Sequence, residues 1–313
     1  MKKLMSLGLF LLLVCLMPLQ ARALVPGGNV VGLQLRCGTV SVAEFEEGSP
    51  AQAAGVRHGD CILWIDDTQI RCAQDVKKAL DCSNGTVTVQ LRRGKEEKTL
   101  RIHPAISSEG PKLGIYLKEG ITGIGTVTWY DPETGRFGTL GHGVNDPEGN
   151  LAAMETGSVY EAGILSVRKG RVGDPGQLMG SITAKTPIGD LTKNTVRGLF
   201  GILDRPIAGQ DLETGTARTG SAVIRSNISG TEVREYSVEI LKIYPTQREN
   251  GRNMLLKVTD PVLLESTGGI VQGMSGSPII QDGKLVGAVT HVLVNDPTTG
   301  YGIFIENMLD AAA

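Results

Sequence analysis

Short apolar or alternating segments, separated by turn signals, run through most of the chain. Apolar and polar residues alternate over residues 279–289, and residues 254–259 form another largely apolar segment. Between such segments stand turn sequences, Asp-Pro-Glu-Thr-Gly at 131–135 and Asn-Asp-Pro at 145–147 and 295–297. Alternation with a period of two and closely spaced turns are typical of half-buried strands, and few segments show a helical period. The pattern predicts a mostly β protein.

The segment from about residue 28 to residue 104 has a different order of elements. Within it, Pro50 is placed to begin a short helix that Gly55 ends. The elements predicted next are an alternating strand after Gly59-Asp60, a helix at 73–80, and a hairpin of residues 86–92 and 98–102. This order resembles a PDZ domain. Residues 105–112 are interpreted as a linker, and 113–313 as a second domain.

A PDZ domain would bind a peptide by adding it as a strand to a sheet edge. The loop Gly32-Leu33-Gln34-Leu35 resembles the backbone loop that holds the peptide carboxylate, so Gly32, Leu33, Gln34 and Leu35 are the predicted peptide-binding residues. The ligand would be a partner peptide or a segment of this chain. The alternative is a purely structural domain. No histidine begins the second predicted helix, so the commonest ligand preference is not supported.

Composition agrees with two mostly β domains. The chain has 313 residues, which matches about two domains of ordinary size. Hydrophobic residues make up 41% of it, enough for two cores, while aromatic residues are only 4% and glycines number 42. The net charge of −2 gives no electrostatic reason to expect nucleic-acid or anionic-lipid binding.

Candidate chemistry is concentrated in Gly273-Met274-Ser275-Gly276-Ser277-Pro278, called here the nucleophile turn. A serine attacks only when a base removes its proton and donors stabilise the resulting oxyanion. Glycines at 273 and 276 permit a turn in which the amides of Gly273 and Ser275 form such an oxyanion hole. The turn resembles that of chymotrypsin-like peptidases. The alternative is a Gly/Ser-rich turn between two strands.

The candidate base is His142, because glycines at 141 and 143 leave its imidazole uncovered. Of the other histidines, His58 and His103 are interpreted as structural, and His291 is placed to line the site. A span of 133 residues separates His142 from Ser275, which suits a base on one β-barrel and a nucleophile on a second. In trypsin-like zymogens an aspartate stands where this chain has Met274, so activation by N-terminal insertion is not expected.

A triad also needs a group that orients the imidazole. Asp260 ends the apolar segment 254–259, where an acid can be held rigidly, yet it is equally placed to cap a turn before Pro261. Spacing alone does not choose between Asp260 and the other acids between base and nucleophile, which are Asp146, Asp174, Asp190, Asp204 and Asp211.

Several continuous blocks resemble the stage IV sporulation protein B (SpoIVB) peptidase family. They are Leu113-Gly114-Ile115-Tyr116, residues 123–146 ending in Gly141-His142-Gly143, and residues 268–278 continuing into 287–306. The resemblance implies a PDZ domain followed by a chymotrypsin-like double β-barrel serine peptidase. It implies Ser275 as nucleophile, His142 as base and Asp260 as acid. Thr290 matches a position thought to support the site, where its hydroxyl would orient the aspartate, although an ordinary strand threonine is commoner.

The first 23 residues are predicted to direct export. Lys2 and Lys3 precede an apolar run over 4–17, and Ala21-Arg22-Ala23 offers the small residues that signal peptidase needs. The run is short for a spanning helix, which needs about 20 residues, but an uncleaved anchor remains the alternative. No later segment is apolar enough to cross a bilayer.

Cysteines fit an exported protein without requiring one. Cys37, Cys61, Cys72 and Cys82 all lie in the first predicted domain, where they permit two disulfides in three pairings or four small buried thiols. The spacing lacks the Cys-x-x-Cys pair typical of zinc sites, and no metal or cofactor is expected.

The resulting hypothesis is an exported serine endopeptidase with a regulatory or targeting PDZ domain. The resemblance implies cleavage of a membrane-anchored regulator during sporulation, in the forespore intermembrane space, which activates an intramembrane protease and a late sigma factor. The protein would be peripheral to the membrane. The alternative is a non-catalytic PDZ scaffold with a degenerate peptidase domain. A general quality-control protease is a third hypothesis.

Overall fold

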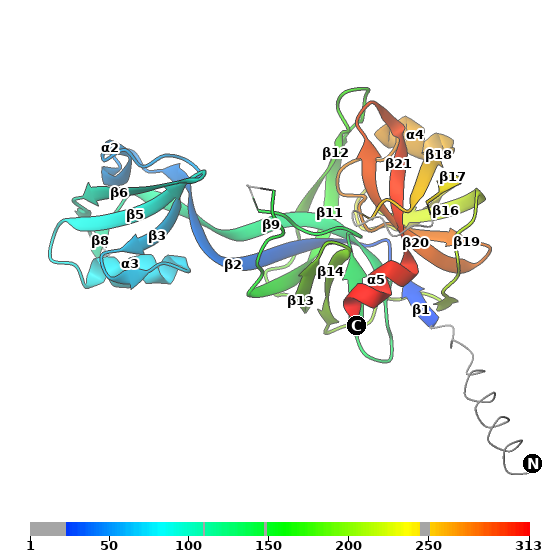
Figure 1. Cartoon of the computed structure of the whole chain (residues 1–313), viewed down its shortest axis with the longest axis horizontal. Helices are drawn as coiled ribbons and strands as arrows, with labels where there is room; N and C mark the ends of the chain where they lie inside the picture. The colour runs from blue at the N-terminus through cyan, green and yellow to red at the C-terminus, as the bar shows by residue number, and fades with distance from the viewer. Residues whose placement is uncertain (1–22, 109, 147–148, 245–250) are drawn as a thin grey trace, which may run out of the picture.

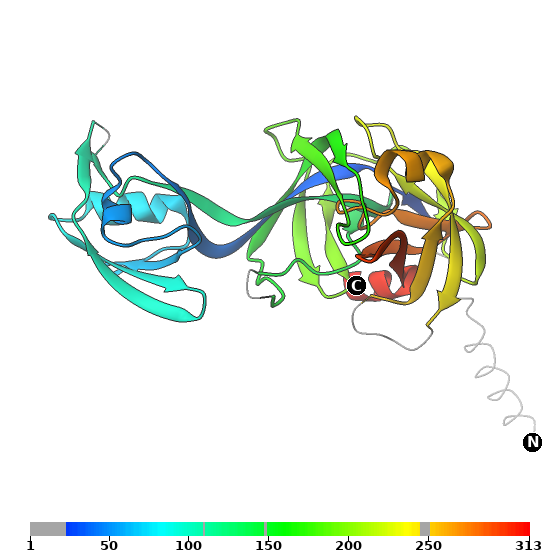
Figure 2. The same ribbon diagram turned by 90° about the horizontal axis from the view of Figure 1, so that it is seen from above.

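The computed structural model describes residues 23–313 except 109, 147–148 and 245–250, so the predicted export segment lies almost wholly outside the described residues. Two bodies are joined by a ribbon of two long antiparallel strands, β2 (Val30–Phe45) and β9 (Ile115–Tyr130) (Figures 1 and 2). Within the described part of the chain, no helix is long and apolar enough to span a membrane.

The first barrel closes on itself because β2 pairs with both β11 and β9. Around the ring the strands follow one another as β9, β10, β14, β13, β11 and β2. The strands introduced here are β1 (Ala23–Pro26), β10 (Arg136–Thr139), β11 (Thr156–Arg168), β12 (Gln177–Ile182), β13 (Gly189–Thr195), β14 (Gly198–Leu203) and β15 (Leu212–Glu213). Val31, Leu33, Val127 and Phe137 fill its core.

The second barrel is a closed ring of six strands, in the order β16-β17-β18-β21-β20-β19. These strands are β16 (Gly220–Ser226), β17 (Arg234–Ile243), β18 (Met254–Val258), β19 (Pro278–Gln281), β20 (Lys284–Leu293) and β21 (Asp296–Phe304). Helix α4 (Pro261–Thr267) follows β18, and helix α5 (Ile305–Ala312) ends the chain. Ile305 and Met308 of α5 join Trp129 and Phe200 of the first barrel in one apolar cluster. The predicted double β-barrel is confirmed.

The PDZ body has its own core, separate from the barrels. Its elements are the outer halves of β2 and β9 with α2 (Pro50–Ala53), β3 (Cys61–Ile65), β4 (Thr68–Gln69), α3 (Ala73–Asp81), β5 (Val87–Arg93) and β6 (Glu96–Ile102). The predicted second helix and closing hairpin are therefore present. The predicted linker instead contains a small hairpin, β7 (Ala105–Ser107) and β8 (Gly110–Lys112). All four described cysteines are free thiols.

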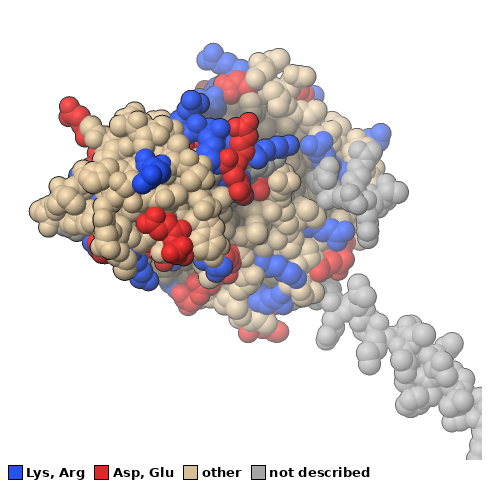
Figure 3. All heavy atoms as spheres, turned by 60° about the vertical axis from the view of Figure 1, so that its left-hand side comes forward, with Lys and Arg blue, Asp and Glu red and all other residues tan. Residues whose placement is uncertain are grey.

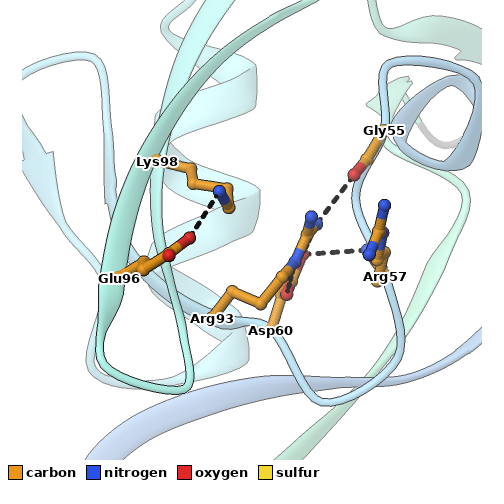
Figure 4. Close-up of polar contacts among 6 residues, drawn as sticks. All are labelled: Gly55, Arg57, Asp60, Arg93, Glu96 and Lys98. Carbon is orange, nitrogen blue, oxygen red and sulfur yellow. Dashed lines mark hydrogen bonds and ion pairs between the residues drawn. The ribbon is translucent and has the colours of Figure 1, made fainter.

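A buried ion pair ties the hairpin of the PDZ body to the turn before β3. Asp60 is 1% exposed and accepts hydrogen bonds from Arg93 Nε and Nη2 at 2.8 and 2.7 Å (Figure 4). Arg93 also donates to the Gly55 carbonyl, and the Arg57 backbone N–H donates to Asp60. Burial raises the pKa of Asp60, but the hydrogen bonds from Arg93 and Arg57 outweigh burial and hold the pKa below its ordinary value.

The PDZ body is inserted into the first barrel, which corrects the predicted division at residues 28 and 113. The inner part of β2, residues 30–35, pairs with β11 on one edge and with residues 121–126 of β9 on the other. The chain thus leaves the first barrel through β2, forms the PDZ body, and returns through β9. Both strands are continuous in sequence, so no local break marks the boundary.

Candidate active site

The nucleophile turn lies immediately before β19, on the side of the second barrel that meets the first. Gly273 and Gly276 have φ of +99° and +96°, a region that favours glycine. A Cβ at Gly276 would lie 2.0 Å from the Thr126 carbonyl oxygen of β9, so only glycine fits there. Thr126 also donates from its backbone N–H to the Ser275 carbonyl and from Oγ1 to the Gly273 carbonyl. The first barrel therefore holds the turn in place.

Peptide planarity sets the direction of the two amides predicted to bind an oxyanion. The Leu178 N–H of β12 donates to the Gln272 carbonyl at 2.8 Å, so the Gly273 N–H points away from β12. The Ser277 N–H donates to the Met274 carbonyl, which turns the Ser275 N–H the opposite way. Among the described residues, neither amide donates to another group of the chain. Both remain available for a developing negative charge, as an oxyanion hole requires.

His142 follows β10 at the end of a strained turn. Leu140 and Gly141 both have φ of +69°, which is costly for leucine. A carbonyl oxygen can only accept, so the contact of 2.9 Å between His142 Nδ1 and the Gly143 carbonyl places the proton on Nδ1. Nε2 is then the free acceptor that a general base needs. Burial lowers the pKa of His142, although the Gly143 contact opposes this shift.

His142 and Ser275 line one cavity of about 490 Å³ between the two barrels. The first barrel contributes the base and the second barrel the nucleophile, as the spacing of these residues predicts. Ser275 Oγ donates to the Thr290 carbonyl at 2.7 Å, which is a resting orientation. The hydroxyl of Thr290 lies 3.2 Å from the carbonyl oxygens of both Gly251 and Tyr301. Thr290 thus supports the nucleophile through its backbone, whereas its hydroxyl does not contact an aspartate.

Asp260 lies elsewhere in the structure, as the N-cap of α4. Its carboxylate accepts hydrogen bonds from the backbone N–H groups of Val262 and Leu263, both at 3.0 Å, and of Ser237 at 3.3 Å. It does not line the cavity that His142 and Ser275 share. The structure therefore does not bring the predicted acid to the predicted base. Capping before a proline at the first helical position explains the local sequence instead.

His291, near the end of β20, is the residue that the structure brings to His142. The two ring centroids are 5.2 Å apart and the rings are tilted by 41°. His291 Nδ1 is buried and has no partner among the described residues. Burial lowers the pKa of His291 to about 4, and His142 and Arg252 lower it further. Its position directly after Thr290 was the sequence signal that placed it at the site.

The predicted carboxylate-binding loop of the PDZ domain is not a loop. Gly32, Leu33, Gln34 and Leu35 form part of strand β2 in the first barrel, paired on both edges. The open edge belongs to the outer half of β9, since residues 115–119 pair only with β2 among the described strands. Glu119 accepts a hydrogen bond from the first residue of α3, Ala73, so this strand borders the helix. These two elements are the ones that border a PDZ groove.

Comparisons with known proteins agree with this organisation. The family model of SpoIVB peptidase S55 matches residues 109–309, and that of a PDZ domain matches residues 27–103. Atu1380 of Agrobacterium fabrum, described as a zinc metalloprotease, is 35% identical over 97 residues, which cover 31% of this chain. Only 25% of that relative is spanned. The described residues contain no group of three or more His, Cys, Asp or Glu that could hold a metal ion.

Two solved structures of the protease Rv3671c of M. tuberculosis are similar at a low level. The inactive form has a TM-score of 0.37 and 16% identity, and the match covers 60% of this chain and 82% of that one. The active form has a TM-score of 0.39 and 17% identity, with coverage of 61% and 73%. The family assignment depends on the match over residues 109–309, more than half of the chain. The chain belongs to the SpoIVB peptidase S55 family, and it is a serine peptidase that carries a PDZ domain.

Proposed function

We propose that this serine peptidase is an exported endopeptidase that cleaves a membrane-associated regulatory protein in sporulation signalling. The observation that carries the endopeptidase assignment is the shared cavity of His142 and Ser275, beside two amides with no partner among the described residues. Family membership supports the signalling role, in which the cut activates an intramembrane protease controlling a late sigma factor. The apolar run at 4–17 supports export.

The proposed reaction begins with a rotation of the Ser275 side chain. Its hydroxyl leaves the Thr290 carbonyl and donates to His142 Nε2, which removes the proton as the oxygen attacks a peptide carbonyl. The Gly273 and Ser275 amides stabilise the tetrahedral oxyanion. His142 then gives its proton to the leaving amine, and water releases the acyl group by the same steps.

The surface charges favour a protein partner over a polyanion. Acidic and basic side chains are interspersed over the face shown in Figure 3, with no extended area of a single sign. A surface of this kind gives little attraction to nucleic acid or anionic lipid. The proposed substrate is therefore recognised through its peptide chain and through the open edge of the PDZ sheet.

A second candidate function is a binding protein with an inactive peptidase domain. Two observations favour it: Ser275 donates to Thr290 instead of His142, and the Asp260 carboxylate caps a helix. The intact base, nucleophile and free amides argue against it, because a scaffold has no use for their arrangement.

Labelling with a fluorophosphonate probe separates the two candidates. We expect stoichiometric labelling that disappears in Ser275→Ala and weakens strongly in His142→Ala. Ser221→Ala, an exposed serine of the same barrel, is the matched control and should label normally. Folded protein that never labels, but still binds a peptide through the PDZ body, would establish the scaffold.

Digestion assays test the signalling role separately. A signalling peptidase should cut few sites in a peptide library and leave unfolded casein largely intact, with Ser275→Ala as control. Extensive casein digestion would instead indicate quality control. Fusing residues 1–30 to a secreted reporter tests export, and a reporter that stays in the cytoplasm would contradict it.

A further inference from the structure

The cavity beside Ser275 is lined mainly by apolar side chains. No Asp, Glu, Lys or Arg is among its lining residues. The polar side chains that line it include those of the site itself, His142, Ser275, Thr290 and His291. Its apolar lining includes Ile124, Pro175, Ile270, Val271, Val292 and Val294. A charged group entering the cavity would therefore find no opposite charge.

Two segments on either side of the nucleophile form walls of this cavity. The first wall, residues 270–272, is fixed by hydrogen bonds from Ile270 N to the Pro297 carbonyl and from Leu178 N to the Gln272 carbonyl. The second wall is the end of β20, where Val292 pairs with Gly300 of β21. A Cβ at Gly300 would lie 2.6 Å from Ile270 Cδ1, so this glycine makes room for the isoleucine. The shape of the walls is set by backbone pairing.

Ile124 extends the apolar surface to the oxyanion hole. Its Cδ1 would lie 3.3 Å from a Cβ placed on Gly273, so the side chain borders the first amide donor. A substrate carbonyl held by the Gly273 and Ser275 amides would carry its own side chain into these surroundings. The side chain next to the cleaved bond therefore enters an apolar space.

We propose that this cavity selects an aliphatic side chain (Val, Leu, Ile or Met) on the residue whose carbonyl Ser275 attacks. The inference rests on the proposed endopeptidase function and names its substrate class. Burial of an aliphatic side chain is favourable by about 25 cal/mol per Å² of apolar surface. A lysine or aspartate in the same place loses its hydration without gaining a partner. The transition state for an aliphatic residue is stabilised preferentially.

Val292 is the specificity-determining residue that can be changed with least disturbance. Its side chain is only partly buried, whereas Ile270 is 2% exposed and belongs to the barrel core. A carboxylate at 292 would give a basic substrate side chain the partner that the wild-type cavity lacks. The matched control is Val262→Asp, since Val262 is 52% exposed on α4 and does not line the cavity.

The experiment compares kcat/KM for fluorogenic peptides that differ only at the residue before the cleaved bond. For the wild type we expect values about 100-fold higher for Leu or Val than for Lys or Asp. Val292→Asp should raise the Lys-to-Leu ratio at least about tenfold, and Val262→Asp should leave it unchanged. Melting curves for both variants show whether each is folded. If Val292→Asp does not fold, Val292→Thr should still lower the preference for Leu.

The outcomes separate this inference from the proposed function. Protein that labels with the fluorophosphonate but cleaves Lys and Leu peptides equally well overturns the specificity and leaves the peptidase intact. Protein that neither labels nor cleaves any peptide overturns the proposed function itself. A preference for aliphatic residues that survives unchanged in folded Val292→Asp would assign the selection to another part of the chain.

Discussion

The imidazole rings of His142 and His291 lie 5.2 Å apart within the cavity that also contains Ser275. Burial lowers the pKa of both rings, and His142 further lowers that of His291. At neutral pH the pair is therefore uncharged. During the reaction His142 gains a proton while its neighbour stays neutral, so the positive charge of the intermediate meets no second cation on the adjacent ring.

The histidine pair should make the folded protein sensitive to acid. In the unfolded chain both rings bind protons near pH 6.5, whereas His291 in the folded state does so only near pH 4. The unfolded state thus binds more protons between these values, and the stability present above pH 6.5 is lost as pH falls toward 4. We expect the Tm of His291→Gln to fall less between pH 7 and pH 4.5 than that of the wild type.

The control for this measurement is His58→Gln, because the His58 side chain is 56% exposed and lies in the PDZ body. Its Tm should follow the wild type across the same pH range. Identical pH dependence in His291→Gln and the wild type would show that His291 does not titrate abnormally.

The pKa of His142 also sets the acid limb of the reaction. A base must be neutral to accept the Ser275 proton, so activity is lost as pH falls through the pKa of His142. Because burial lowers that pKa, the midpoint should lie below 6.5. The rate of fluorophosphonate labelling between pH 4.5 and 8 measures it. A midpoint at or above 6.5 would mean that the ring is more solvated than its surroundings indicate.

Asp260 should behave as a helix cap when it is replaced. Asn is as good an N-cap as Asp, so Asp260→Asn should keep the Tm and label at a rate within about tenfold of the wild type. Asp260→Ala should cost about 1 kcal/mol of stability. The measurements are thermal melting and labelling rate. A fall of about 10⁴-fold in Asp260→Asn, with the fold intact, would show that Asp260 reaches His142 in the active conformation.

Local patterns predicted the elements and two site residues. Alternation of buried and exposed positions, as in β16 and β17, fixes a strand whatever it pairs with, and flanking glycines mark His142 and Ser275. Asp260 shows the limit of such signals. Asp-Pro before a helix is a capping signal in its own right, and spacing could not decide between cap and triad acid.

Long-range pairing was not predictable from the sequence. Residues 30–35 pair with residues more than a hundred positions away, on β11, and nothing in their apolar pattern distinguishes a barrel strand from a PDZ strand. The same pattern continues into residues 40–45, which do belong to the PDZ body. The peptide-binding loop was therefore placed on the wrong strand, although the PDZ helices and hairpin were placed correctly.

Gly276 should be intolerant of even a methyl group. A Cβ there would overlap the Thr126 carbonyl oxygen and lie 2.6 Å from Leu140 N, both of them backbone atoms that cannot yield cheaply. We expect Gly276→Ala to lower the Tm and reduce the labelling rate at least about 100-fold, since the Ser275 amide would move with the turn. Gly283→Ala is the matched control: its φ is +72°, but no atom lies within 4 Å of the added Cβ. Equal effects of the two substitutions would show that backbone conformation alone matters.

Arg93→Met should destabilise the PDZ body far more than Lys98→Met does. Figure 4 shows the two ion pairs side by side: Arg93 with Asp60, whose side chain is 1% exposed, and Lys98 with Glu96, which is 75% exposed. Removing Arg93 leaves a buried carboxylate without its main donor, whereas water replaces Lys98 at the surface. We expect the first thermal transition to fall by at least about 5 °C in Arg93→Met and by less than about 2 °C in Lys98→Met.

Acid gives an independent test of the same pair. The pKa of Asp60 is lower in the folded state than the ordinary 3.8, so its contribution is fully present above that value and is lost as pH falls through the folded pKa. The difference in transition temperature between the wild type and Arg93→Met should therefore shrink below about pH 4. A difference that stays constant down to pH 2 would assign the effect of Arg93 to packing of its aliphatic stem and its bond to the Gly55 carbonyl.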